Sequence, residues 1–245
     1  MMPGTCVALL ALVLSSSSPA VAQSASFTVS QNGSPVGTAS FNVAPKSDGY
    51  NSSSVVRVNM QGLNYSLSKT ESLSRSMGLV HVQLSAIVNN SAVNVTAKPD
   101  GAHFLINISA NGRSNTTSLD GHDVAVFLPE LDPGALETLL ALATSHNNRD
   151  LWAIIPKQAG SIQPIQVTTY RDEQGTLNGS PIAVHHLVAT ISGSETNLFS
   201  DPENQLLQAE LPQQGFALVR DGFVLTPSAK PLAPSEPPAR PPAQP

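Results

Sequence analysis

The chain has 245 residues, with 12 Lys or Arg, 17 Asp or Glu and a formal net charge of −5. The basic residues are few and not clustered, so the sequence lacks the basic footprint of a nucleic-acid-binding protein and the polybasic patch of a membrane-surface protein. Cys6 is the single cysteine. The rest of the chain therefore has no disulfide, thiolate nucleophile or cysteine metal site, and its fold must be held by a hydrophobic core.

The first residues are typical of a secretory signal peptide. An apolar run at residues 7–14 is followed by small residues at Ala20 and Ala22, which form a cleavage site before Gln23. The apolar run is too short for a transmembrane helix, which needs about 20 apolar residues. The pattern predicts a signal peptide over residues 1–22 and an exported protein with no transmembrane segment after cleavage. The absence of cysteine after residue 22 favours a bacterial protein, periplasmic or extracellular.

Most of the remaining chain has the pattern of β-strands. Residues 27–43 alternate apolar and polar on both sides of Asn32-Gly33, which is the sequence of a β-hairpin. Short segments rich in Val, Ile, Thr and Phe follow, with turn signals such as Asn111-Gly112 between them. Short turns join antiparallel strands, whereas parallel strands need a long crossover. We therefore predict an antiparallel meander of about a dozen strands, of which the last six cover 151–156, 162–171, 180–192, 196–200, 204–212 and 215–225.

The strand pattern is interrupted by one helical segment. Asp132 is a candidate N-cap, and Pro133 suits the first helical position. The segment is apolar nearly all round, which is typical of a helix buried on more than one side. We predict a helix over about 133–146 on the concave face of the sheet. The fold class is mainly β: an antiparallel curved sheet or unclosed β-barrel with this one helix.

The domain organisation follows from these patterns and from the C-terminal composition. We predict that residues 23–226 form a single β-rich half-barrel domain. Residues 227–245 hold eight of the chain's prolines, so we expect a disordered extension that acts as a spacer or as a docking strand for a protein partner.

Motifs of catalysis and metal binding are missing from the sequence. There is no Gly-x-Ser-x-Gly elbow, and the Asp-Gly dipeptides have the character of turns. His185 and His186 are adjacent in a predicted strand, so they point to opposite faces and cannot serve one site without a bulge. The six histidines do not have zinc-ligand spacing. We predict a protein that is not an enzyme and that uses no cofactor or metal.

The last third of the chain carries a more particular pattern. Residues 197–220 read NLFSDPENQLLQAELPQQGFALVR, with an Asp-Pro-Glu-Asn turn between two strands. Together with the opening hairpin and the central helix, this resembles exported bacterial proteins of uncharacterised families that are similar in architecture to the LolA- and LppX-like lipoprotein carriers. The resemblance spans about residues 25 to 225 and implies an unclosed antiparallel barrel whose concave side is covered by helices. This chain departs from the carriers in having one clear helix.

Two functions follow as hypotheses. In the first, the protein binds a hydrophobic ligand, such as an acyl chain, between curved sheet and helix. In the second, it is a structural or interaction module of the cell envelope with a dry core and a Pro-rich docking tail. For Trp152, core packing is the default interpretation. The candidate residues for a ligand cavity are Phe27, Val29, Phe41, Leu136, Leu139, Leu140 and Trp152.

Overall fold

The computed structural model describes residues 22–157 and 159–226. The predicted Pro-rich tail and all but the last residue of the predicted signal peptide lie outside the described residues. Within the part of the chain that the structure describes, no helix combines the length and the apolar character that crossing a membrane requires.

The first eight strands form one antiparallel layer in which each strand pairs with the next along the chain. The predicted Asn32-Gly33 turn is confirmed: both residues have positive φ, 49° and 80°, as a tight hairpin requires. The strands are β1 (Gln23–Gln31), β2 (Ser34–Lys46), β3 (Gly49–Met60), β4 (Leu63–Ser74), β5 (Leu79–Val88), β6 (Ser91–Asp100), β7 (His103–Ala110) and β8 (Arg113–Asp120).

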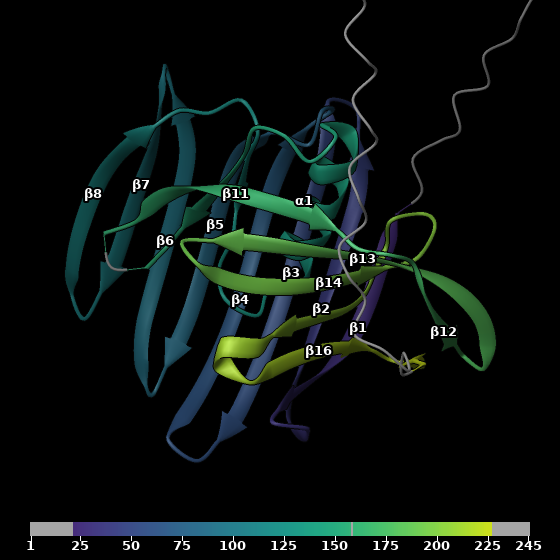
Figure 1. Cartoon of the computed structure of the whole chain (residues 1–245). Helices are drawn as coiled ribbons and strands as arrows, with labels where there is room; N and C mark the ends of the chain where they lie inside the picture. The colour runs from purple at the N-terminus through teal and green to yellow at the C-terminus, as the bar shows by residue number, and fades with distance from the viewer. Residues whose placement is uncertain (1–21, 158, 227–245) are drawn as a thin grey trace, which may run out of the picture.

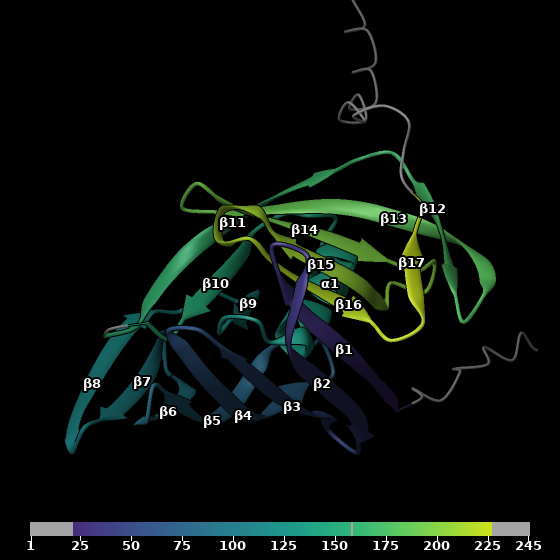
Figure 2. The same ribbon diagram turned by 90° about the horizontal axis from the view of Figure 1, so that it is seen from below.

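The later strands form a second layer that lies across the first (Figures 1 and 2). Strand β16 pairs with β1 and so joins the two layers along one side. At the opposite edge of the first layer, β8 pairs with β7, and the sheet is not closed into a barrel. The second layer contains β9 (Ala125–Phe127), β10 (Leu151–Ile155), β11 (Ser161–Thr169), β12 (Glu173–Leu177), β13 (Ser180–Ile191), β14 (Ser194–Ser200), β15 (Leu206–Leu211), β16 (Phe216–Arg220), β17 (Phe223–Leu225) and the short 3-10 helix η1 (Pro212–Gln214).

The predicted fold class is confirmed, with three differences in detail. Strands β9 and β12 have no counterpart in the predicted set, because one has only three residues and the other is mostly polar. Strands β9 and β10 pair in parallel, which the predicted meander does not include. The segment 215–225 holds two strands, since Asp221-Gly222 makes a turn with Gly222 at φ 81°.

Helix α1 (Pro133–Ser145) is the crossover that joins the parallel strands β9 and β10. Asp132 caps it by accepting hydrogen bonds from the backbone N–H groups of Gly134 and Ala135, at 3.0 and 3.2 Å. The helix lies between the layers and contacts β2, β3, β9 and β15 (Figure 2). It is buried on nearly every side, as its apolar composition predicts.

The first turn of helix α1 meets the first layer at Gly134. A Cβ atom built on Gly134 would lie 2.3 Å from Ser54 Oγ and 3.2 Å from Phe41 Cβ. The absent side chain therefore sets how near the helix comes to β2 and β3.

The other layer is attached through Glu137. Its Oε2 atom accepts a hydrogen bond from the backbone N–H of Leu206 in β15 at 2.8 Å. Glu137 is 5% exposed, and this burial, which outweighs the hydrogen bond from Leu206, raises the pKa of its carboxyl to about 7.

The close approach at Gly134 gives a prediction for stability. Gly134→Ala should lower the free energy of unfolding by about 1–3 kcal/mol, although alanine is the better helix former, because the new methyl group overpacks the contact with Ser54 and Phe41. Chemical denaturation measures the change. Ser54→Ala removes the nearest atom, so the double variant should recover part of the loss; a Gly134→Ala protein as stable as wild type would show that the approach is looser than described.

The raised pKa of Glu137 gives a prediction for pH dependence. An acid that binds its proton more tightly in the folded state stabilises the fold below its ordinary pKa, near 4.5, and loses that contribution as pH rises through about 7. In wild type, the free energy of unfolding should therefore fall by a few kcal/mol between these pH values. In Glu137→Gln, whose amide oxygen can still accept the hydrogen bond from Leu206, this fall should be absent. Urea unfolding across the pH range tests this. The exposed control Glu195→Gln should leave the curve unchanged, and identical curves for wild type and Glu137→Gln would refute the assignment.

Candidate functional site

The inner face of β4 to β7 forms an apolar wall. In each strand alternate residues point inward, and the register places them in rows across the four strands. One row consists of Leu67, Ala86, Val93 and Ala110. The next consists of Leu84, Val95 and Ile108, opposite Lys69 of β4, and Tyr65 pairs with Val88 at the end of the wall.

Two loop segments of similar sequence lie over this wall. One is Leu128-Pro129-Glu130, which follows β9, and the other is Ile155-Pro156-Lys157, at the end of β10. The backbone N–H of Leu128 donates to the carbonyl of Ile154 at 2.9 Å, so the two segments are held together. The space between the wall and these segments is a cavity of about 320 Å³. This volume lies within the range of about 300–1,000 Å³ that is usual for small-molecule sites.

The rim of the cavity is polar. Glu130 and Lys157, one from each loop segment, form an ion pair, and their side chains are 47% and 60% exposed. The Tyr65 hydroxyl donates to the backbone carbonyl of Glu130 at 3.2 Å. Burial, together with the nearby carboxylates of Asp132 and Glu130, raises the pKa of Tyr65 well above its ordinary value, so its hydroxyl remains a donor.

Exposure changes along the cavity. Val95 and Leu84 are 1% and 4% exposed, whereas Val88 is 36% exposed. The cavity is thus enclosed and apolar at one end, and open and polar at the other. Such an arrangement suits a molecule with an apolar body and a polar head.

The residues that the sequence suggested as cavity lining lie elsewhere. Six belong to the packed main core, where Phe27 and Phe41 stack with ring centroids 6.0 Å apart. Trp152 stacks on His122 at 3.5 Å and, three residues from Ile155 in the same strand, points to the opposite face of β10. The six core residues are Phe27, Val29, Phe41, Leu136, Leu139 and Leu140. The structure brings these six together in the core and not around the cavity.

The residues that line this cavity had weak signals in the sequence. Leu67, Ala86 and Val95 are ordinary strand residues, and their convergence depends on register. A better signal was the pair of tripeptides Leu128-Pro129-Glu130 and Ile155-Pro156-Lys157: each has an apolar residue, a proline and a charge, and the charges are opposite.

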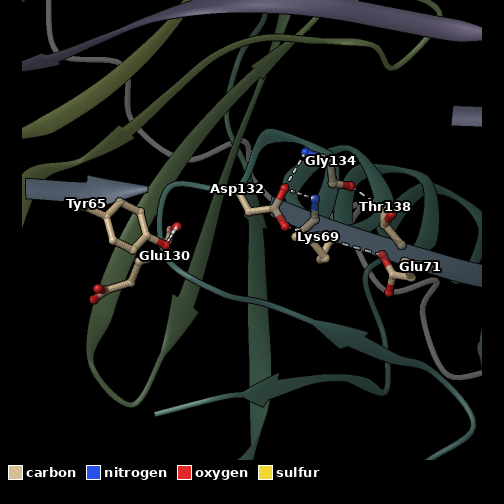
Figure 3. A network of polar contacts seen from close by, with 8 residues as sticks. Tyr65, Lys69, Glu71, Glu130, Asp132, Gly134 and Thr138 are labelled. Carbon is tan, nitrogen blue, oxygen red and sulfur yellow. Dashed lines mark hydrogen bonds and ion pairs between the residues drawn. The ribbon is translucent and has the colours of Figure 1, made fainter. Parts of the chain in front are cut away.

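A cluster of buried charges lies beside the apolar wall, at the start of α1 (Figure 3). Lys69 Nζ lies 2.8 Å from Asp132 Oδ2 and 3.1 Å from Glu71 Oε2, and all three side chains are 0% exposed. Among the described residues of the cluster, Glu71 Oε1, Asp132 Oδ2 and the hydroxyls of Ser52 and Ser54 have no hydrogen-bond partner, and Asp132 Oδ2 faces Lys69 as an ion pair. Two carboxyl groups and one amine thus share an environment from which water is excluded.

The pKa values of this cluster reflect competing effects. Burial alone would lower the pKa of Lys69, but the adjacent Asp132 and Glu71 carboxyls raise it above its ordinary value. Burial raises the pKa of Glu71, and Lys69 only partly offsets this. Burial thus makes the Glu71 carboxyl a weaker acid than usual, while the two carboxyls make the Lys69 ammonium harder to deprotonate.

The histidines of β13 have separate partners. His185 lies 2.8 Å from Asp172, and His186 lies 3.2 Å from Glu173, in agreement with the expectation that adjacent strand residues serve different faces. Within residues 22–157 and 159–226, no group of three or more His, Cys, Asp or Glu side chains is arranged to hold a metal ion.

Comparisons with known proteins assign no family to this chain. No family model matches the sequence, and no curated protein matches it. Among solved structures it is similar to a DUF1089 family protein (PA1994) from Pseudomonas aeruginosa, with 13% sequence identity and a TM-score of 0.42. The similarity covers 87% of this chain and 98% of that one.

Proposed function

We propose that this is an exported, non-enzymatic protein of the cell envelope that binds a hydrophobic or lipid-like molecule. The observation that carries the proposal is the apolar cavity of about 320 Å³ between β4–β7 and the two loop segments. An acyl chain would lie along the rows that contain Ala86 and Val95, and its polar head would stay at the rim beside Lys157.

The energetics support this placement of the ligand. Each buried methylene contributes about 0.8 kcal/mol, so a chain of several methylenes gives useful affinity without any directional contact. At the rim, Lys157 is already paired with Glu130, so an anionic head must compete with that carboxylate. The acyl chain of the ligand therefore contributes most of the binding affinity, and its anionic head contributes little.

The alternative is a structural or protein-interaction module with a dry core and a docking tail. No feature of the described residues favours it over ligand binding, because its main support is the composition of residues 227–245. Absence of any apolar ligand from the cavity would be its strongest evidence.

The first test fills the cavity. Protein stripped of bound lipid should take up dodecanoate in calorimetric titrations. In Ala86→Phe the larger side chain occupies space that about two methylene groups of the ligand would fill. The lost burial costs about 1.4–1.6 kcal/mol of binding free energy, so binding should weaken about tenfold. Because Ala86 is buried, Ala110→Trp at the half-exposed end provides a second filling variant that perturbs the core less.

The control is Ala92→Trp in β6, an exposed position next to the inward Val93. It should bind dodecanoate as wild type does. Folded wild-type protein that takes up no apolar probe would contradict the proposal, and so would equal affinity of the wild type and both filling variants.

The second test locates the polar head. Glu130→Gln removes the competitor for Lys157 and should strengthen dodecanoate binding two- to fivefold, which is the size of an exposed ion pair. Lys157→Met should weaken dodecanoate binding by a similar factor and leave dodecanol binding unchanged. If both variants bind dodecanoate as wild type does, the head lies elsewhere.

A further inference from the structure

We propose that Lys69 and Asp132 form an intramolecular amide, an isopeptide bond, with Glu71 as the catalytic residue that transfers protons. The three groups meet at one nitrogen atom: Lys69 Nζ lies 2.8 Å from Asp132 Oδ2 and 3.1 Å from Glu71 Oε2. Figure 3 shows them side by side beneath the first turn of α1. This inference is independent of ligand binding.

The setting provides the nucleophile. All three side chains are 0% exposed, so the ion pair has lost its solvation, and transfer of one proton from the Lys69 ammonium to an adjacent carboxylate gives the neutral amine that attacks. The amine and the acid are also fixed in contact, so their reaction is intramolecular with a high effective concentration. Exclusion of water further favours the amide over hydrolysis.

The electrophile is the carboxyl carbon of Asp132, and the N-terminus of α1 activates it. The backbone N–H groups of Gly134 and Ala135 donate to Asp132 Oδ1 at 3.0 and 3.2 Å. Oδ1 becomes the oxyanion when the amine attacks Cγ, so these two donors stabilise the tetrahedral intermediate as an oxyanion hole does. In the product Oδ1 is the amide oxygen and can still accept both bonds, so the helix cap is kept.

Glu71 completes the proton transfers. It contacts Nζ through Oε2, while its Oε1 has no hydrogen-bond partner among the described residues. The Lys69 ammonium starts with three protons: one passes to Asp132 Oδ2, one is relayed to the same oxygen through Glu71, and one stays on the amide nitrogen. The C–N bond forms, the C–Oδ2 bond breaks, Oδ2 leaves as water, and Glu71 ends in its starting protonation state.

The bond would join β4 directly to the start of α1. After residue 22 the chain has no cysteine, so it cannot use the disulfides by which exported proteins are often cross-linked. An amide between Lys69 and Asp132 constrains the unfolded chain in the same manner and is not broken by reductants.

The experiment is mass spectrometry of the purified full-length protein after denaturation and proteolysis. We expect an intact mass lower by one water than the sequence of the observed chain requires, and a branched peptide that joins Lys69 to Asp132. Asp-Gly sequences such as Asp221-Gly222 can also lose water, so the branched peptide is the deciding observation. Its absence from folded wild-type protein would overturn the proposal, whatever the intact mass.

Matched variants separate catalysis from folding. Lys69→Arg keeps the positive charge and Glu71→Gln keeps the shape, and circular dichroism verifies that each folds. Lys69→Arg should abolish the branched peptide, and Glu71→Gln should slow its formation by about a hundredfold. The control Lys46→Arg, in the partly exposed pair with Asp48, should retain the bond. Formation of the branched peptide at the wild-type rate in folded Glu71→Gln would remove Glu71 from the mechanism.

Discussion

The structure depends on a helix that is apolar on nearly every side and must be covered on every side. A helix on the surface of a sheet hides only one face, so α1 needs a layer beneath it and another above it. The pairing of β16 with β1 brings the second layer back over the first and produces this arrangement. The return of the unclosed sheet over itself therefore encloses α1 between two layers.

The cavity lies where this enclosure is incomplete. Helix α1 covers the inner face of β2 and β3, and it contacts the second layer through β9 and β15. Beyond the helix, the segments that contain Pro129 and Pro156 lie over part of the inner face of β4 to β7 and line the cavity with it. The rigid φ of proline suits a segment that must lie over a wall without joining its strands.

The buried charges connect the two features. Asp132 caps α1 and contacts Lys69 of β4, and it comes only two residues after Glu130 at the rim of the cavity. The position of the loop over the cavity is thus set by the contact between Asp132 and the sheet. A covalent bond at this point would hold the same loop in place while a ligand enters and leaves.

The sequence predicts the architecture better than the site, for a physical reason. A hairpin at Asn32-Gly33 and a helix capped by Asp132 are specified by local turn and cap chemistry, and both are present. The cavity depends on the register of four strands and on loops remote in sequence, which no local pattern encodes. Aromatic and leucine residues such as Phe27 and Leu139 are prominent in the sequence, whereas the cavity wall includes small residues such as Ala86, which belongs to the same core cluster and has no distinctive pattern of its own.

Lys69 and Glu71 are a sequence signal for a buried cluster of charges. Leu67, Lys69, Glu71 and Leu73 alternate along β4, so the two charges occupy the inward face between two leucines. Charges on an apolar face must be paired when buried. The partner, Asp132, is far away in the sequence and was identifiable from it only as a helix cap.

The most direct test of the central claim, that the ligand lies between β4–β7 and the two loops, is methyl NMR of the protein with a saturated dodecanoate chain. The account predicts intermolecular Overhauser effects from the chain to the methyl groups of Val93, Val95 and Ile108, and none to Leu139 or Leu140 in the packed core. Effects to Leu139 and Leu140 instead, or no effects to any methyl group at saturating ligand, would contradict it.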